Sequence, residues 1–481
     1  MSEATTDAPA DASGAWIENH PLAELRLGDS ASLTRTFTQD DVQAFALLSG
    51  DVNPSHVDAA YAAGDRFHQV VAHGMWSAAL VSNLLGTRLP GPGTVYLAQN
   101  LRFDHPVFVG DTVRATVTVR ALRPGSAPSA TLHCSVVNQR NDVVVDGEAQ
   151  VLLPTEKLRL APAHLPRLEL RDPGIKLRAL VAQALQALRG HEPPRVAVVH
   201  AVDAVSLGGA IDAARAGLIA PVFVGPEGKL RAAAHAAGID LAPYPLEPTE
   251  HSHAAAERAV AMARAGDVAM LMKGSLHTDE LMHAVVDAGA GLRTARRISH
   301  VFVIDAVGQP KLQLLTDAAI NVAPDLMAKR DIVLNAIDLA HALGIEQPRV
   351  AILSAVETVT PKIPSTLDAA ALCKMADRGQ IPGAVLDGPL AFDNAVSKRA
   401  AQTKGIVSPV SGEADILVAP DLEAGNMLAK QLEYLADAKV AGIVLGARVP
   451  VVLTSRADLP DARMASCALA VLQWLHAQVT A

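Results

Sequence analysis

At 481 residues the chain is longer than one hydrophobic core usually organises, so we expect two or three domains. Half of the residues are hydrophobic but only 3% are aromatic, which favours helices packed on mostly parallel sheets over an aromatic-rich sandwich. The formal net charge of −9 argues against a nucleic-acid-binding protein, although it leaves room for a local basic pocket that holds a phosphate-bearing ligand.

The cysteines and the N-terminus indicate the compartment. Cys134, Cys373 and Cys467 are scattered, which predicts neither a disulfide framework nor a metal cluster and is typical of a reducing environment. Residues 1–14 lack the basic start and apolar stretch of a signal peptide, and we expect a disordered tail there. No apolar run approaches the roughly 20 residues that span a bilayer. We therefore expect a cytoplasmic protein without a membrane segment.

The first domain is expected over residues 15–153. Residues 31–50 predict a strand, an N-cap near Thr38 and an amphipathic helix. The segment Gly74–Leu85 is apolar nearly all round, which predicts a buried helix. Four strand-like runs follow, and their spacing favours antiparallel pairing. This order predicts a long buried helix wrapped by a curved antiparallel sheet.

The second domain is expected over residues 174–481, after a linker. Residues 154–173 contain four prolines among alternating charged and apolar residues, as is typical of an interdomain linker. Beyond it, short apolar runs alternate with helical patterns and predict buried parallel strands. These runs begin near residues 195, 220, 268, 301, 349, 414, 442 and 449. We expect an α/β domain with a mostly parallel sheet, whose ligands bind beyond the carboxyl ends of the strands.

The first candidate site is the segment Ser-Gly-Asp-Val-Asn-Pro-Ser-His at residues 49–56. Asp51 and His56 lie on a loop that leaves a helix, and Pro54 restricts the backbone between them. An acid and an imidazole held in this way can share one water, with one group removing a proton and the other supplying one. Gly74, at a helix N-terminus, offers N–H groups that suit a thioester oxygen as it becomes enolate-like.

Taken alone, such an Asp and His pair is more often turn-forming than catalytic. Together with AHGMWSAALVSNLLG, LPGPGTVYLAQNLRF and PVFVGDTV, however, the Asp-x-Asn-Pro-x-His motif resembles the MaoC-like (R)-specific enoyl-CoA hydratases over about residues 25–153. The resemblance implies a hot-dog fold. It also implies that Asp51 and His56 are the catalytic pair, that the Gly74 N–H is the oxyanion donor, and that Ser82 is a supporting polar residue near the substrate.

Two further histidines and one alternative role belong to this region. We expect His68 and His73 to be structural, because a histidine beside a helix start more often makes a structural hydrogen bond than it catalyses. A hot-dog domain that serves only as a dimerising scaffold is the alternative, and the intact Asp51 and His56 pair disfavours it.

The second candidate site is Thr-Ser-Arg at residues 454–456, directly after the apolar run VPVVL. The guanidinium of Arg456 can hold a phosphate through two N–H bonds, and the Ser455 hydroxyl can hydrogen-bond a leaving thiolate. Asp458 and Asp461 are carboxylates within reach of the same loop and can handle the thiol proton. On its own, a Ser-Arg pair after a strand is more often an ordinary cap.

The wider pattern resembles phosphate acetyl- and butyryltransferases over about residues 174–481. The segments that carry the resemblance are LMKG at 271, RISHVFVID at 297, TDAAIN at 316, DGPLAFDNAVS at 387, ADILVAPDLEAGNMLAKQL at 414 and VLTSRAD at 452. LMKG and VLTSRAD are nearer the butyryltransferases. The resemblance implies that Ser455 and Arg456 place phosphate and stabilise the CoA thiolate. The acid that the acetyltransferases use fits Asp461 with a one-residue offset.

The chain departs from that family near Thr278. Where the family carries an arginine that helps to bind CoA or phosphate, this sequence has Met282 and His283. This departure puts the affinity for anions in question. Nearby arginines that could compensate for the missing charge are Arg293, Arg296 and Arg297.

Both resemblances imply CoA thioester substrates, so the predicted protein is bifunctional. One domain hydrates trans-2-enoyl-CoA to (R)-3-hydroxyacyl-CoA, and the other transfers a short acyl group between CoA and phosphate. The alternative is an active hydratase joined to a non-catalytic domain that senses acyl-CoA. No metal or cofactor is predicted beyond these substrates, and the resemblance implies a homo-oligomer.

Overall fold

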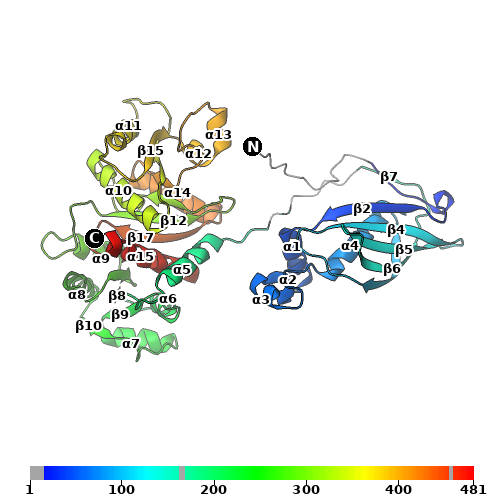
Figure 1. Ribbon diagram of the computed structural model, residues 1–481. Coiled ribbons are helices and arrows are strands. Elements are labelled where there is room, and N and C mark those ends of the chain that lie inside the picture. The colour runs from blue at the N-terminus through cyan, green and yellow to red at the C-terminus, as the bar shows by residue number, and fades with distance from the viewer. Residues whose placement is uncertain (1–15, 162–167, 169, 454–458, 481) are drawn as a thin grey trace. The chain divides into compact units, whose positions relative to one another are not determined.

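The computed structural model describes residues 16–161, 168, 170–453 and 459–480. The chain forms two compact units, Met1–Leu170 and Arg171–Ala481 (Figure 1). The tail predicted for residues 1–14 lies outside the described residues. No described helix has both the length and the apolar character that crossing a membrane requires.

The first unit is built on a five-stranded antiparallel sheet in the order β2-β4-β5-β6-β3. Its strands are β2 Ser30–Thr36, β3 Val95–Phe103, β4 Thr112–Arg123, β5 Ser129–Asn138 and β6 Val143–Leu152. Buried and half-exposed side chains alternate along β5, because successive residues of a strand face opposite sides. The buried helix α4 (Gly74–Thr87) packs against this sheet through Val81 and Leu84. The predicted hot-dog fold is thus confirmed.

The first unit also contains short helices and strands outside the five-stranded sheet and α4. Helix α1 (Gln39–Ser49) begins with a capping box, in which Thr38 and Asp41 each accept a hydrogen bond from the other's backbone N–H. The other elements are β1 Ile17–Glu18, η1 Leu22–Glu24, α2 Pro54–Val57, α3 Ala59–Gly64 and β7 Arg159–Leu160. Strand β7 pairs with β1, so part of the segment interpreted as linker forms secondary structure within the first unit.

The second unit is organised by a sheet in which eleven strands are seen among the described residues, in the order β10-β9-β8-β11-β18-β17-β12-β13-β16-β14-β15. The strands are β8 Arg195–Val199, β9 Ala220–Gly225, β10 Leu246–Pro248, β11 Met270–Lys273, β12 Ser299–Asp305, β13 Gln313–Thr316, β14 Arg349–Leu353, β15 Val385–Leu390, β16 Ile416–Val418, β17 Lys439–Leu445 and β18 Val451–Val452. Most neighbouring strands are parallel, which confirms the predicted α/β class.

Helices connect these strands. They are α5 Ile175–Ala187, α6 Ala204–Arg215, α7 Glu227–Ala236, α8 Ser252–Ala265, α9 Thr278–Val286, α10 Leu326–Ala342, α11 Pro364–Asp377, α12 Phe392–Val396, α13 Lys398–Thr403, α14 Leu422–Leu435 and α15 Pro460–Thr480. Asp203, Asp325 and Asp421 cap α6, α10 and α14 by accepting a backbone N–H in the first turn. Helix α15 buries its middle, from Ala465 to Leu472, in the main core of this unit.

Two strands of the second unit run in directions that the sequence pattern does not reveal. The apolar runs at 301 and 442 form β12 and β17, which pair antiparallel with each other. Strand β12 is also antiparallel to β13, and β17 to β18. The prediction of parallel strands was therefore wrong for these two runs. A continuous apolar run reports burial on both faces of a sheet, whatever the direction of the neighbouring strand.

The three cysteines are free thiols. Burial raises the pKa of Cys134 to about 11 and those of Cys373 and Cys467 to about 12. Because the thiolate is the reactive form, we expect native protein to react slowly with a chromogenic disulfide reagent at pH 8, and all three thiols to react after unfolding in guanidinium. Absorbance of the released chromophore measures both. A rapid reaction of these thiols in the native protein would contradict this expectation. If the reaction is slow, the same reagent can be used to measure the CoA thiol released in an activity assay.

Candidate active sites

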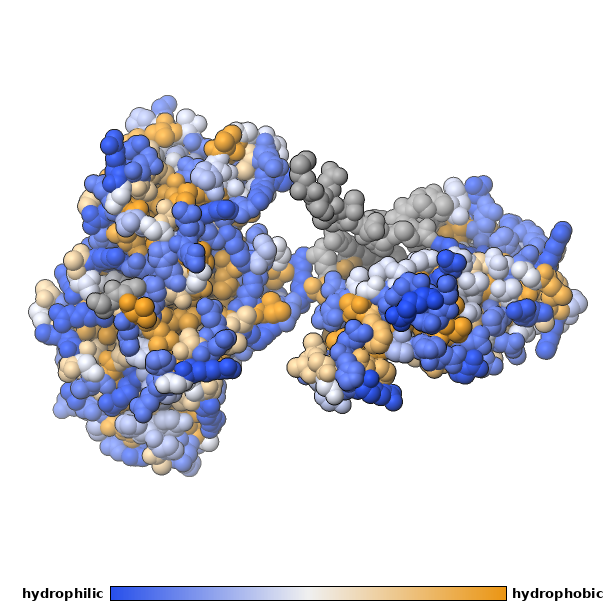
Figure 2. All heavy atoms as spheres, in the orientation of Figure 1, coloured by the Kyte–Doolittle hydropathy of each residue, from blue (hydrophilic) through white to orange (hydrophobic). Residues whose placement is uncertain are grey.

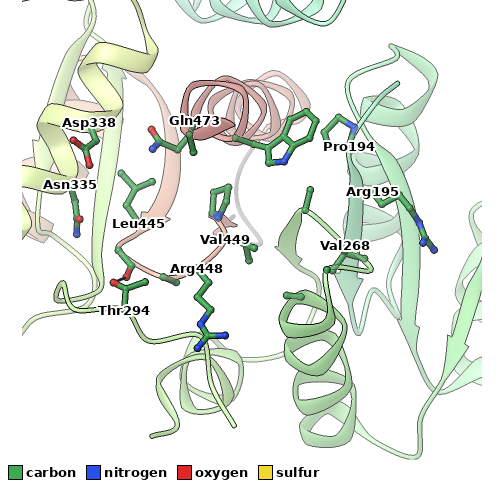
Figure 3. Close-up of a pocket in the computed structure, with 18 of the residues that line it drawn as sticks. Pro194, Arg195, Val268, Thr294, Asn335, Asp338, Leu445, Arg448, Val449 and Gln473 are labelled. Atoms are coloured by element: carbon green, nitrogen blue, oxygen red, sulfur yellow. Dashed lines mark hydrogen bonds between the residues drawn. The ribbon is translucent and has the colours of Figure 1, made fainter. Parts of the chain in front are cut away.

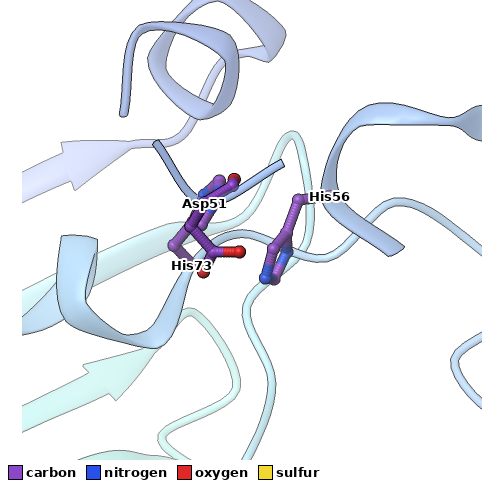
Figure 4. A group of neighbouring side chains, drawn as sticks. All are labelled: Asp51, His56 and His73. Carbon is purple, nitrogen blue, oxygen red and sulfur yellow. The ribbon is translucent and has the colours of Figure 1, made fainter. Parts of the chain in front are cut away.

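The first candidate site lies where α1 ends and α2 begins. Gly50 ends α1 in the left-handed conformation with φ 75°, which turns the chain into the short loop that carries Asp51. Asn53 then caps α2 by accepting a hydrogen bond from the Ser55 N–H, and Pro54 occupies the first helical turn. This compact turn brings His56 next to Asp51. Figure 4 shows the Asp51 carboxylate pointing toward the His56 ring.

A third side chain, His73, completes the cluster. One side-chain nitrogen or oxygen atom from each of Asp51, His56 and His73 lies within 4.8 Å of the corresponding atoms of the other two. Asp51 is exposed, His56 is half-buried, and His73 is buried. The structure therefore brings together the two residues predicted to be catalytic and adds a histidine that was expected to be structural.

The hydrogen bonds of His56 define which ring nitrogen is available. Nδ1 lies 2.6 Å from the carbonyl oxygen of Val71, and a carbonyl oxygen only accepts. Nδ1 therefore carries a proton and donates it, which leaves Nε2 with a lone pair when the imidazole is neutral. The arrangement presents an imidazole acceptor beside a carboxylate, and such a pair can hold and polarise one water molecule.

Gly74 is the first residue of α4. The N–H groups of a first helical turn have no acceptor within the helix, so they remain available to an anionic oxygen. A Cβ built on Gly74 would lie 3.1 Å from two ring carbons of Phe103, so a larger residue here would press against that ring. Glycine keeps the approach to these N–H groups open.

A pocket of about 710 Å³ adjoins this cluster and is lined by His56 and Gly74. Ser77, one turn after Gly74, is buried and also lines the pocket, whereas Ser82 is exposed farther along α4 and does not. Sequence reasoning missed Ser77, although its spacing of three from Gly74 places both on one helix face. Arg66 and His105 line the same pocket and offer positive or hydrogen-bonding groups to a phosphorylated ligand.

The second candidate site centres on residues that the structure does not describe. Ser455, Arg456 and Asp458 lie outside the described residues, between the end of β18 and the start of α15. Asp461 is described, and it is exposed in the first turn of α15. Strand β18 pairs in parallel with β11, with Met272 level with Val452. The undescribed segment therefore follows the carboxyl end of β18, where ligands of open α/β sheets bind.

Polar groups among the described residues also lie at the carboxyl ends of β8 and β11, which are neighbours in the sheet. Lys273, the last residue of β11, is buried at 6% exposure, and its ammonium group lies 3.4 Å from the Gly274 carbonyl oxygen. The Ser275 hydroxyl donates to the His200 carbonyl oxygen at 2.6 Å and accepts the Val202 N–H at 3.0 Å, which ties the loops after β11 and β8 together. Sequence reasoning noted LMKG as a family motif but did not single out the buried lysine.

The arginines named as replacements for the missing cation already have partners. Arg296 forms an ion pair with Asp338, and the Arg293 side chain donates to the Val286 carbonyl oxygen. Arg297 donates from Nε to Asn321 Oδ1 at 2.7 Å. Met282 is buried on α9 in an apolar cluster. Met282, which stands where the resemblance led us to expect an arginine, therefore contributes no charge.

A separate pocket of about 920 Å³ lies in the second unit (Figure 3). Its lining includes Arg195 at the start of β8, Val268 just before β11 and Val449 just before β18. It is thus found at the amino ends of these parallel strands, on the edge opposite the one that the Ser-Arg segment follows. Gln473 and Asp338 complete parts of its wall, and Figure 3 shows Arg448 extending away from Gln473.

Two family models match the chain. Residues 247–471 match the model described as phosphate acetyl/butaryl transferase, and residues 27–136 match the MaoC like domain. The second range includes the cluster of Asp51, His56 and His73. The first range includes β11, β18 and the start of α15.

Three known proteins are similar to parts of this chain. A phosphate acetyltransferase from Rhizobium meliloti is 62% identical over 288 residues, which are 60% of this chain and 91% of that protein. A phosphate butyryltransferase from Clostridium acetobutylicum is 42% identical over 290 residues, 60% of this chain and 96% of that protein. A solved (R)-hydratase from Pseudomonas aeruginosa is 44% identical, with coverage of 32% and 99% and a TM-score of 0.31.

Proposed function

The chain belongs to the phosphate acetyl/butyryl transferase family and carries a MaoC-like domain, and on this premise we propose that it is a bifunctional acyl-CoA enzyme. The second unit exchanges CoA for phosphate on a short acyl group. The first unit adds water to a trans-2-enoyl-CoA to form an (R)-3-hydroxyacyl-CoA. Acyl-CoA, CoA and phosphate are thus its partners, and neither reaction as proposed draws on a resident cofactor.

The proposed transfer is a direct displacement at a thioester. A phosphate oxygen forms a bond to the acyl carbonyl carbon, the C–S bond breaks, and the products are acyl phosphate and the CoA thiolate. Arg456 holds the phosphate through two N–H bonds, and Ser455 donates to the departing sulfur. The thiolate then takes up a proton from solvent to give the CoA thiol, and Asp461 relays that proton. Buried Lys273 adds positive charge at the same sheet edge. The match to the transferases carries this part of the proposal.

The proposed hydration uses the described cluster of the first unit. One water lies between the Asp51 carboxylate and His56 Nε2. Its oxygen bonds to C3 while one of these two groups takes a proton from the water, and negative charge moves onto the thioester oxygen. C2 then takes a proton from the Asp51 and His56 pair, which returns to its starting state. The Gly74 N–H stabilises that oxygen. Two observations carry this activity: Asp51 lies beside His56, and His56 and Gly74 at the start of α4 line one pocket.

A non-catalytic acyl-CoA sensor is the second candidate for the second unit. The observation that favours a sensor is buried Met282, which stands where the resemblance implies an arginine. Loss of that charge would lower the affinity for phosphate, and thus the rate of transfer, more than it lowers the affinity for the uncharged parts of CoA. Dependence of CoA release on phosphate separates the two candidates.

We also propose that the chain forms a homo-oligomer. Leu47, Leu48 and Val52 are exposed at 73%, 84% and 66%, and Figure 2 shows apolar side chains gathered over α1 and α2. Exposed apolar patches of this kind mark association surfaces. We expect Leu48→Glu to lower the mass measured by light scattering after size exclusion, and Leu27→Glu, at a similarly exposed leucine, to leave it unchanged. A monomeric wild type would contradict the proposal.

A further inference from the structure

His73 contacts each part of the first candidate site. Its Nε2 lies 2.9 Å from the backbone carbonyl oxygen of Asp51, so the ring donates to the loop that carries the acid. Its ring packs against the His56 ring, with centroids 3.9 Å apart and planes at 32°. It also precedes Gly74 and is the N-cap residue of α4, and its carbonyl oxygen accepts the Trp76 N–H.

The surroundings of His73 hold its ring in one place. It is 2% exposed, and Phe45 of α1 packs on it with centroids 5.0 Å apart. His73 Nδ1 is buried, with no hydrogen-bond partner among the described residues. The ring is thus oriented through the single bond from Nε2 and through its two ring neighbours. A buried imidazole with this one bond is suited to setting the position of Asp51 and His56 relative to each other.

We propose that His73 is a positioning residue of the hydratase site, a role that rests on the hydratase function proposed above. His73 hydrogen-bonds the Asp51 backbone and packs against the His56 ring, so it sets the distance between the Asp51 carboxylate and the His56 imidazole that share the water. By preceding Gly74 it also ties them to the N–H that receives the enolate oxygen. A misplacement of about 1 Å in such a constellation can cost about 100-fold in rate.

The test compares two substitutions at this position. His73→Gln keeps an N–H donor at about the reach of Nε2, whereas His73→Leu has similar bulk and no donor. With crotonyl-CoA we expect His73→Leu to lower kcat about 10- to 100-fold with little change in KM, and His73→Gln to recover most of the loss. The exposed His68 is the matched control, and His68→Asn, which suits its left-handed backbone (φ 60°), should hydrate like wild type.

Other outcomes overturn the inference. A His73→Leu variant that hydrates like wild type would show that the site needs no anchor there. Equal losses in the Gln and Leu variants, accompanied by a matching fall in Tm, would assign His73 a purely structural role. A wild type that does not hydrate crotonyl-CoA would instead overturn the proposed hydratase function, and this inference with it.

Discussion

Wild-type protein is expected to release free CoA from acetyl-CoA or butyryl-CoA only when phosphate is present, and Arg456→Ala to lose that release by about 100- to 1000-fold. The guanidinium offers two parallel N–H bonds to the attacking phosphate, and its charge offsets the charge that develops on the transferring group. Arg456→Lys keeps the charge but loses the paired geometry, so its activity should lie between the two. Thiol release followed spectrophotometrically, at varied phosphate, measures each variant.

Controls for this experiment come from the same unit. Arg215 is exposed at the end of α6, and Arg215→Ala should transfer like wild type. Comparing the two substrates shows which acyl chain the site prefers. If wild type binds acyl-CoA but releases no CoA with phosphate, the second unit is a sensor, and the transferase proposal fails while the hydratase proposal stands.

Asp51→Asn and His56→Ala are each expected to lower hydration of crotonyl-CoA by about 100- to 10,000-fold, the range typical of a lost general acid or base. Asparagine preserves the size of Asp51 and its hydrogen bond from the Asn53 N–H, so the loop that leads to α2 should remain folded. The loss should therefore appear in kcat, with Tm close to that of wild type. Loss of absorbance at the enoyl thioester band follows the reaction.

A neighbouring acid supplies the matched control for this pair. Asp40 is exposed in the first turn of α1, away from the capping pair Thr38 and Asp41, and Asp40→Asn should hydrate normally. Each activity also serves as an experimental control for the other. Asp51→Asn should retain phosphate-dependent CoA release, and Arg456→Ala should retain hydration. Hydration by Asp51→Asn at the wild-type rate would contradict the catalytic role proposed for Asp51. Absence of hydration by the wild type would instead favour the alternative in which the first unit is a dimerising scaffold.

Local patterns of side chains were enough to predict the two fold classes. Alternation along β5 indicates a strand with one buried face, and the apolar composition of α4 indicates a helix buried against it. Strands such as β8 and β11 are apolar except for a charged residue at one end, because both faces of their sheet are covered. The cap at Thr38 and the turn at Gly50 are equally local, since each depends on residues within four positions.

Tertiary structure decided what depends on residues distant in sequence. The antiparallel direction of β12 and β17 is set by their neighbours in the sheet, and burial alone carries no direction. The placement of Ser77 rather than Ser82 at the pocket depends on how α4 meets the loops around it. His73 lies 22 residues from Asp51, so only the folded chain brings its ring to that backbone. The sequence by itself thus determined the local elements and predicted candidate residues for the chemistry from their types and spacing, while packing between distant segments decided which of the described residues meet.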